Sequence, residues 1–325
     1  FLIIFGAALG VFGLVHHFSG DTSIYGLRPT QTAAFGPFFN RDHFAGYMEL
    51  FIALPVALIV TRYAEGEKRL ICGVAAIFMG VAAVFTLSRG GMISIIAEMI
   101  FLAAMSLRQS RTAAGEGGMA HQASGVKRGF LAMTAVAVIL AAIVTGVIWL
   151  GAEPVINRIA TGDANNTDVS KAPSFYSTRG VIWEDTWQMI RRNPLTGVGL
   201  GAYETAYPIY TRETGEQGIT AEAHNDYLQI LADAGVIGAA VALWFLITLF
   251  RAIARVVRSS DRLAAAIALG GGAGLFGLLV HSLFDFNLQL PSHALVFLIL
   301  STVISYLGSA AELSGPIKDS RPGSH

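Results

Sequence analysis

Side chains able to do chemistry concentrate in one stretch of the chain, residues 177–235, which is rich in charge, Trp, Tyr and Pro. The rest of the sequence consists mainly of apolar runs. Near the end of the stretch, His224 is flanked by Glu222 and Asp226. A histidine titrates near neutral pH and a nearby carboxylate can orient it, so His224 is a candidate general base. The alternative, a histidine that is only hydrogen-bonded, stays open.

The same three residues raise the question of a metal site. On a helix their spacing of i, i+2 and i+4 does not converge on one face, and no second histidine is near in the sequence. The single cysteine, Cys72, excludes an intrachain disulfide and a cysteine metal cluster. We therefore predict that the protein uses no metal and no cofactor.

Two arginines are candidates for binding an anion. Arg89 stands in the tight junction 87–91 between two apolar runs, where an arginine that faces lipid is costly. It either contacts lipid phosphate at the interface or lines an anion site. Arg179 precedes a predicted helix at 181–192, and the backbone donors at a helix N-terminus attract negative charge.

Polar residues near these positions are candidates for substrate binding, although local structure also explains several of them. Asn225 or Asp226 would cap a helix that starts there, and capping accounts equally for polar groups at 40–43. A cation at position 191 suits the C-terminal end of the helix at 181–192. The substrate-binding candidates are Arg41, His43, Ser88, Arg191, Asn225, Asp226 and Tyr227.

The composition indicates a membrane protein. Of 325 residues, 54% are hydrophobic and 14% are charged, against roughly a quarter charged in soluble domains. The apolar residues cluster in blocks of about 16 to 23, the length that a helix needs to cross a bilayer. The formal net charge is zero, so the bulk charge gives no reason to expect a nucleic-acid partner.

These blocks predict an all-α polytopic protein of about eight transmembrane helices and one large, partly helical loop. The order is five spans in 1–150, the loop at 151–234, three spans in 235–307 and a tail at 308–325. The chain starts inside an apolar run without Met, which we interpret as the C-terminal portion of a longer protein. The predicted spans are 1–17, 45–61, 70–87, 91–107, 129–150, 235–257, 263–281 and 293–307.

Basic residues predict how these helices are oriented. Lys and Arg gather in the segments 61–69, 107–128 and 251–262, which we therefore place on the cytoplasmic side. The large loop then lies on the opposite, external face. Residues 112–125 are small and turn-forming, and are typical of a flexible linker.

The large loop has three further features, and two of them can be interpreted in two ways. Trp183, Trp187 and Ile190 form one stripe on a helix, which either lies at the membrane surface or packs on a core of the loop itself. The glycine-rich run 197–201 is a turn or, less expectedly, a phosphate nest. A further helix starting near 225 continues past Ala234–Gly235 into the next span.

Five segments taken together resemble the bacterial O-antigen ligase family. They are GPFFNRDHFAGYMEL, TLSRGG, STRGVIWEDTWQMIRRNPLTGVGLGAYE, AHNDYLQILADAGVIG and HSLFDFNLQLPSHAL. Single pieces are weak, but their order and spacing over nearly the whole chain are specific. The family includes surface-glycan ligases, polymerases and protein O-oligosaccharyltransferases.

This resemblance implies a multi-pass enzyme of the bacterial inner membrane with a GT-C-like architecture and an active periplasmic face. The implied reaction transfers a glycan from an undecaprenyl diphosphate carrier to a hydroxyl of lipid A core, a polysaccharide or a protein. It uses no nucleotide sugar or metal and inverts the anomeric carbon. The implied catalytic residues are Arg89, Arg179 and His224.

A transporter or flippase that only moves a lipid-linked glycan is the alternative. Transporters carry broken helices and ionisable residues at mid-membrane. Here Glu49 and Glu98 are the exceptions in spans that otherwise lack central charges. Most polar groups gather on one external face, which favours chemistry at the membrane surface. A membrane scaffold, the third possibility, predicts no clustering of the three candidate catalytic residues.

Overall fold

The computed structural model describes residues 1–20, 23–29, 34–115, 134–149, 175–211 and 220–313. Seven helices in these ranges are long and apolar enough to cross a membrane. They are α1 (Leu2–Ser19), α2 (Arg41–Val60), α3 (Glu67–Phe85), α4 (Arg89–Gly115), α9 (Asp226–Val256), α10 (Arg262–His281) and α11 (Pro291–Leu313). The chain is an all-α, multi-pass membrane protein, which confirms the predicted fold class.

The helices coincide with the predicted spans but differ from them in length. α4 continues through Gly115, into the predicted linker, and α11 continues through Leu313, past the predicted start of the tail at 308. The predicted span 129–150 contains a shorter apolar helix, Thr134–Trp149. The rest of the linker, residues 151–174 and 212–219 of the loop and the end of the tail lie outside the described residues.

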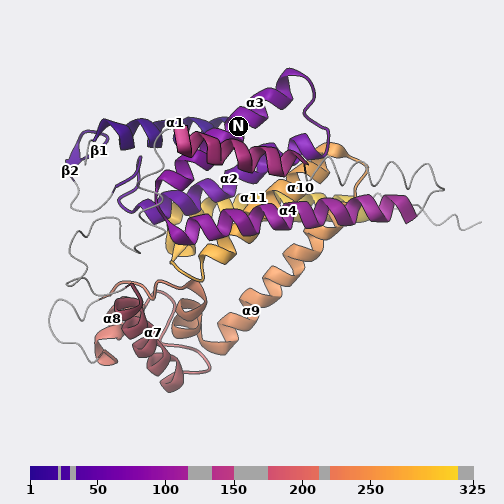
Figure 1. Cartoon of the computed structure of the whole chain (residues 1–325). Helices are drawn as coiled ribbons and strands as arrows, with labels where there is room; N and C mark the ends of the chain where they lie inside the picture. The colour runs from indigo at the N-terminus through magenta and orange to yellow at the C-terminus, as the bar shows by residue number, and fades with distance from the viewer. Residues whose placement is uncertain (21–22, 30–33, 116–133, 150–174, 212–219, 314–325) are drawn as a thin grey trace, which may run out of the picture.

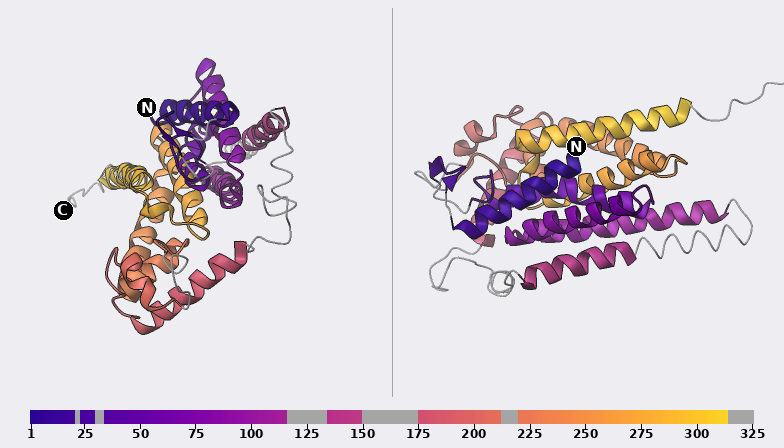
Figure 2. Two further views of the ribbon diagram at one scale, coloured as in Figure 1. Left: turned by 90° about the vertical axis from the view of Figure 1, so that its left-hand side faces the viewer. Right: turned by 90° about the horizontal axis from the view of Figure 1, so that it is seen from above.

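The core of the bundle is the contact between α2 and α10, which lie side by side in Figure 2. α2 is buried along most of its length. α10 approaches it through glycines: a Cβ added at Gly270 would lie 2.7 Å from the Leu54 Cα. One added at Gly274 would lie 2.8 Å from the Glu49 carbonyl oxygen. Small residues allow this close approach, which stabilises helix pairs in lipid through van der Waals packing.

Alternating helix directions bring four helix starts to one end of the bundle, which we name the lobe end. There α1, α3 and α10 end, while α2, α4, α9 and α11 begin (Figure 1). A short antiparallel hairpin of β1 (Ser23–Ile24) and β2 (Arg28–Pro29) follows α1 at this end. Exposed Arg262 and Glu65 form an ion pair at the opposite end.

The large loop folds into a lobe beside the bundle (Figure 1). It consists of α7 (Phe175–Arg192), α8 (Tyr203–Ala206), the short 3-10 helix η1 (Tyr207–Ile209) and the first turns of α9. Its own small core contains Met189, Ile190 and Tyr203. Ile190 therefore packs inside the lobe, whereas Trp187 of the same predicted stripe is 52% exposed. The packing of Ile190 supports the reading in which the stripe contacts a core of the loop itself, and the location of Trp187 at the membrane surface stays a prediction.

Gly235 interrupts α9 with φ 62° and ψ −163°, where the lobe part of the helix meets its membrane part. The turn after α7 binds the backbone groups that the break exposes. Val198 N donates to Ala232 O (2.8 Å), and Val236 N donates to Pro194 O (2.9 Å). Because no unpaired backbone group can face lipid, this turn is what permits the break. Residues 197–201 thus form a structural turn, as the first reading expected.

Replacing Gly235 with alanine should lower the thermal stability of the purified protein. The change forces a side chain into a positive φ, at a cost of about 1–3 kcal/mol, and its Cβ would lie 2.3 Å from Leu195 O. The measurement is thermal unfolding in detergent. Gly73→Ala is the control, because Gly73 lies within α3 and an added Cβ meets nothing there within 4 Å. Equal melting temperatures for the two variants would contradict the structural role of Gly235.

Candidate active site

The carboxylate of Asp285 is the centre of a polar cluster at the lobe end. Asp285 lies in the turn between α10 and α11 and is 1% exposed. Its Oδ1 contacts His224 Nδ1 at 3.2 Å and accepts a hydrogen bond from Phe286 N at 3.0 Å. Its Oδ2 lies 3.8 Å from His43 Nε2. Two histidines from distant parts of the chain thus share one carboxylate.

Asp285 is ionised in this environment. Burial alone would raise its pKa and is the largest single influence. The hydrogen bond from His224 and the charges of His43 and His281 together outweigh burial and lower the pKa to about 2. Asp285 therefore acts as a fixed negative charge between the imidazoles.

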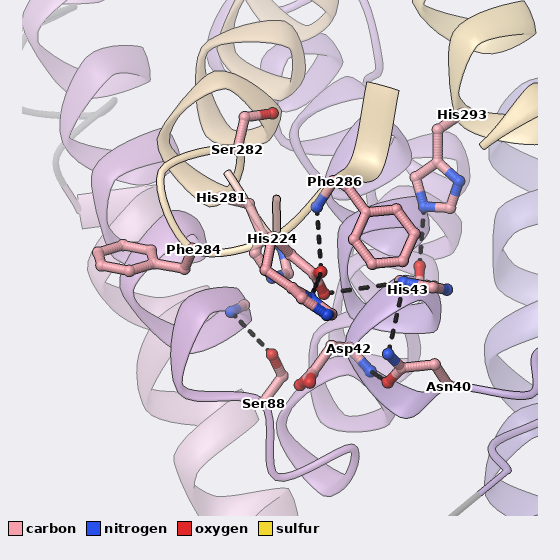
Figure 3. A network of polar contacts seen from close by, with 12 residues as sticks. Asn40, Asp42, His43, Ser88, His224, His281, Ser282, Phe284, Phe286 and His293 are labelled. Carbon is pink, nitrogen blue, oxygen red and sulfur yellow. Dashed lines mark hydrogen bonds and ion pairs between the residues drawn. The ribbon is translucent and has the colours of Figure 1, made fainter. Parts of the chain in front are cut away.

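His224 directly precedes Asn225, the capping residue of α9, and has a positive φ of 49°. Of the two capping candidates in the sequence, Asn225 caps α9 by accepting hydrogen bonds from Tyr227 N and Leu228 N. The rings of His224 and His43 both meet the ring of Phe286 edge-on, each with centroids 4.9 Å apart. Figure 3 shows the imidazoles of His224 and His43 near each other and near Phe286, with Asp42 close by.

The residues after His224 fasten the start of α9 to the end of α10. Asn225 Nδ2 donates to Leu283 O (3.0 Å), and Tyr227 OH donates to Leu279 O (2.7 Å). Asp226 Oδ2 accepts hydrogen bonds from Ser282 Oγ and Leu288 N. These three predicted substrate-binding residues therefore hold His224 against the turn that carries Asp285.

Arg179 reaches the same turn from the lobe. Its Nη1 donates a hydrogen bond to the carbonyl oxygen of Phe284, the residue before Asp285. Burial lowers the pKa of the guanidinium, and the negative charges of Asp285 and Asp42 act in the opposite direction. α7 begins at Phe175, so Arg179 lies inside the helix, and the prediction that it precedes a helix beginning at 181 was wrong.

Arg89 is the first residue of α4, at the same end of the bundle. The buried Ser88 caps α4 by accepting a hydrogen bond from Gly91 N (3.1 Å), which gives it a structural role (Figure 3). A Cβ added at Gly90 would lie 2.8 Å from the His281 ring and 3.5 Å from the Phe284 Cβ. The backbone beside Arg89 thus touches the residues that flank Asp285.

Two further predicted substrate-binding residues have different positions. Arg41 is half-buried at the start of α2, two residues before His43. Arg191 is exposed near the C-terminal end of α7, ~18 Å along the helix from Arg179 at 1.5 Å per residue. Arg191 therefore does not belong to the polar cluster, and its position suits the helix dipole instead.

The acidic partner of His224 is the main feature that the sequence did not identify. Glu222 and Asp226 flank His224 in the chain, yet the contacting carboxylate is Asp285, 61 positions away. Asp285 was not among the candidate residues. The sequence did contain one signal for Asp285, since an acidic residue in a short turn between two membrane spans is a candidate functional residue. Among the described residues, no group of three or more His, Cys, Asp or Glu could hold a metal ion.

Comparison with known protein families gives one match. Residues 74–243, slightly more than half of the chain, match the family described as O-antigen ligase. This range contains α4, the lobe and the start of α9, and therefore Arg89, Arg179 and His224. The curated proteins include no match to this chain.

Glu222 should make the stability of the protein depend on pH near neutrality. Burial raises its pKa to about 7, and the charges of Asp233, Asp226 and Glu204 add to this. The pKa of Glu222 in the folded protein lies above its value of 4.5 in the unfolded chain. The contribution of Glu222 to the stability of the fold is therefore complete below about pH 4.5. It disappears as the pH rises through about 7.

We expect Glu222→Gln to flatten the fall in melting temperature between pH 5 and pH 8, measured by thermal unfolding in detergent. Glu184→Gln, on the exposed face of α7, should keep the wild-type slope. A Glu222→Gln slope identical to that of wild type would show that Glu222 does not titrate in this range.

Proposed function

We propose, since the chain belongs to the O-antigen ligase family, that it transfers a glycan from an undecaprenyl diphosphate carrier to an acceptor hydroxyl. The transfer takes place at the lobe end of the bundle, on the periplasmic face of the bacterial inner membrane. Lipid A core, a growing polysaccharide and a protein side chain all supply the same nucleophile, a hydroxyl group. The chemistry below holds for each of them.

One observation carries this proposal: Arg179 and His224 contact consecutive residues of a single turn. Arg179 binds Phe284 O and His224 contacts Asp285, and adjacent Cα atoms are about 3.8 Å apart. A cation and a base so close together can act on one bond, because groups that act together must lie within a few ångströms of it. A membrane scaffold has no need of this arrangement.

Positive charge at the lobe end suits a diphosphate leaving group. Arg89 and Arg179 supply guanidinium groups, which bind phosphate oxygens through paired hydrogen bonds. The N-termini of α2, α4 and α9 begin at the same end, and each helix dipole favours an anion there. These fixed charges stabilise the negative charge that develops as the sugar–phosphate bond breaks.

The reaction is a single displacement at the anomeric carbon. The acceptor oxygen forms the new bond to this carbon, while the bond between the carbon and the diphosphate oxygen breaks. Because the acceptor attacks from the side opposite the diphosphate, the configuration of the carbon is inverted. The acceptor proton passes to His224, and undecaprenyl diphosphate leaves with the bonding electron pair. Asp285 holds the His224 ring and stabilises the imidazolium that forms, because it stays ionised beside it.

Arg179→Ala should reduce the release of undecaprenyl diphosphate by about 100- to 1,000-fold, the usual effect of removing one group that stabilises developing charge. Arg179→Lys should restore little of it, because lysine lacks the planar fork. The assay uses full-length protein in detergent with an undecaprenyl diphosphate-linked oligosaccharide and an acceptor.

Arg191→Ala is the matched control for this experiment, since it removes the same side chain from the other end of α7. It should stay within about twofold of wild type, because an exposed arginine contributes little. Wild-type release that persists in Arg179→Ala would contradict the role of Arg179. No release from wild type with any donor and acceptor would favour a transporter.

Transfer should continue in the presence of a chelator, because the arginines supply the positive charge that a metal gives in other glycosyl transfers. The measurement is the rate of undecaprenyl diphosphate release with and without EDTA. A loss of activity that Mg²⁺ restores would contradict this expectation. It would make Glu222, His224 and Asp226 candidate ligands again.

A further inference from the structure

A buried pair of polar side chains, Glu49 of α2 and His281 of α10, lies beneath the polar cluster. Glu49 is 0% exposed and His281 is 1% exposed. The Glu49 Oε1 and the His281 Nδ1 are 2.9 Å apart. Burying ionisable side chains inside a membrane protein costs free energy, because they lose their contact with water. Pairing the two side chains offsets part of this cost. The displacement at the anomeric carbon uses neither of them.

His281 is directly connected to the turn that carries Asp285. Its carbonyl oxygen accepts hydrogen bonds from Phe284 N (2.8 Å) and Asp285 N (3.1 Å). The position of the His281 backbone therefore sets where this turn begins. Arg179 binds the same turn at Phe284 O, so a shift of His281 would reach that contact as well.

The imidazole of His281 also packs against the start of α4. A Cβ added at Gly90 would lie 2.8 Å from both Cδ2 and Nε2 of the ring. The ring thus stands between the Glu49 carboxylate on one side and the Gly90 backbone on the other. Since Gly90 follows Arg89 directly, the ring packs beside the backbone that carries Arg89.

Glu49 itself cannot shift freely. Its carbonyl oxygen would lie 2.8 Å from a Cβ at Gly274, where α10 packs tightly on α2. A carboxylate on such a rigid helix holds the His281 ring in one rotamer, because the Nδ1 hydrogen bond fixes the plane of the ring. The Glu49–His281 contact thus connects α2 to α10 beside the start of α4.

We propose that Glu49 and His281 form a positioning pair for glycan transfer, holding Arg89 at its working distance from Asp285 and His224. This inference rests on the proposed function, since it assigns the pair a role in that reaction. Glu49 and His281 touch neither donor nor acceptor and act through Arg89. The pair acts on the catalytic step because Arg89 stabilises charge that develops only as the bond breaks.

A double-mutant cycle between Glu49 and Arg89 tests this proposal. Single-turnover release of undecaprenyl diphosphate is measured for wild type, Glu49→Leu, Arg89→Ala and the double variant, with enzyme in excess. Glu49→Leu should lower the catalytic rate by up to about 100-fold, the effect of a misplacement of about 1 Å, and leave KM within about twofold. In the Arg89→Ala background it should have no further effect, because the arginine that it positions is absent.

Conservative and steric variants separate positioning from folding. Glu49→Gln keeps an oxygen that accepts the Nδ1 hydrogen bond, so it should recover most of the catalytic rate. Gly90→Ala changes no charge but pushes on the His281 ring, and it should lower the catalytic rate as Glu49→Leu does. Thermal unfolding of each variant in detergent shows that the protein is folded before rates are compared.

Glu98→Gln is the matched control. Glu98 is also 0% exposed, in α4, where its Oε1 accepts a hydrogen bond from Ala53 N (3.1 Å) rather than from His281. It should keep the wild-type catalytic rate. If wild type is active and the rate losses of Glu49→Leu and Arg89→Ala multiply in the double variant, the two residues act independently. That result would overturn the positioning role and leave the proposed function intact. No release from wild type would overturn the proposed function and the positioning role with it.

Discussion

Burial of the Asp285 carboxylate is the constraint on which the site depends. An ionised group at 1% exposure needs cationic or hydrogen-bonding partners, and they come from separate segments of the chain. His224 approaches from the start of α9, His43 from the start of α2, and Phe286 N from the turn itself. Satisfying one buried charge thus gathers residues that the sequence separates widely. The same arrangement places His224 and Arg179 beside the turn that carries Asp285.

The break in α9 joins the lobe to the membrane bundle. A continuous helix would need no partner, but the break at Gly235 exposes backbone groups, and the turn at 194–199 binds them. Lipid cannot replace these bonds, so the lobe and the span below it are held in a fixed relation. This relation matters for the site, because α7 carries Arg179 while His224 lies directly before the cap of α9.

Close helix packing lets buried acids remain inside the bundle. α10 approaches α2 through Gly270 and Gly274, which leaves little freedom for either helix to move. Glu49 and Glu98 both lie in this packed region, and each has one oxygen bound to a group of another helix. Ionisable residues at this depth also occur in transporters, so their presence alone does not distinguish a transferase. Glu49 is bonded to His281, whose carbonyl oxygen accepts hydrogen bonds from the turn that carries Asp285.

The sequence by itself determined the membrane helices, the partly helical loop and a helix that starts at Asn225 or Asp226. These depend on local composition and periodicity, because a run of apolar residues in lipid has few alternatives to a helix. It also separated Arg89, Arg179 and His224 from the other polar residues. Only the tertiary structure decided that Asp285 contacts His224 and that Arg191 lies far from the polar cluster. Both outcomes depend on how helices pack across long stretches of chain, and no local pattern records that packing.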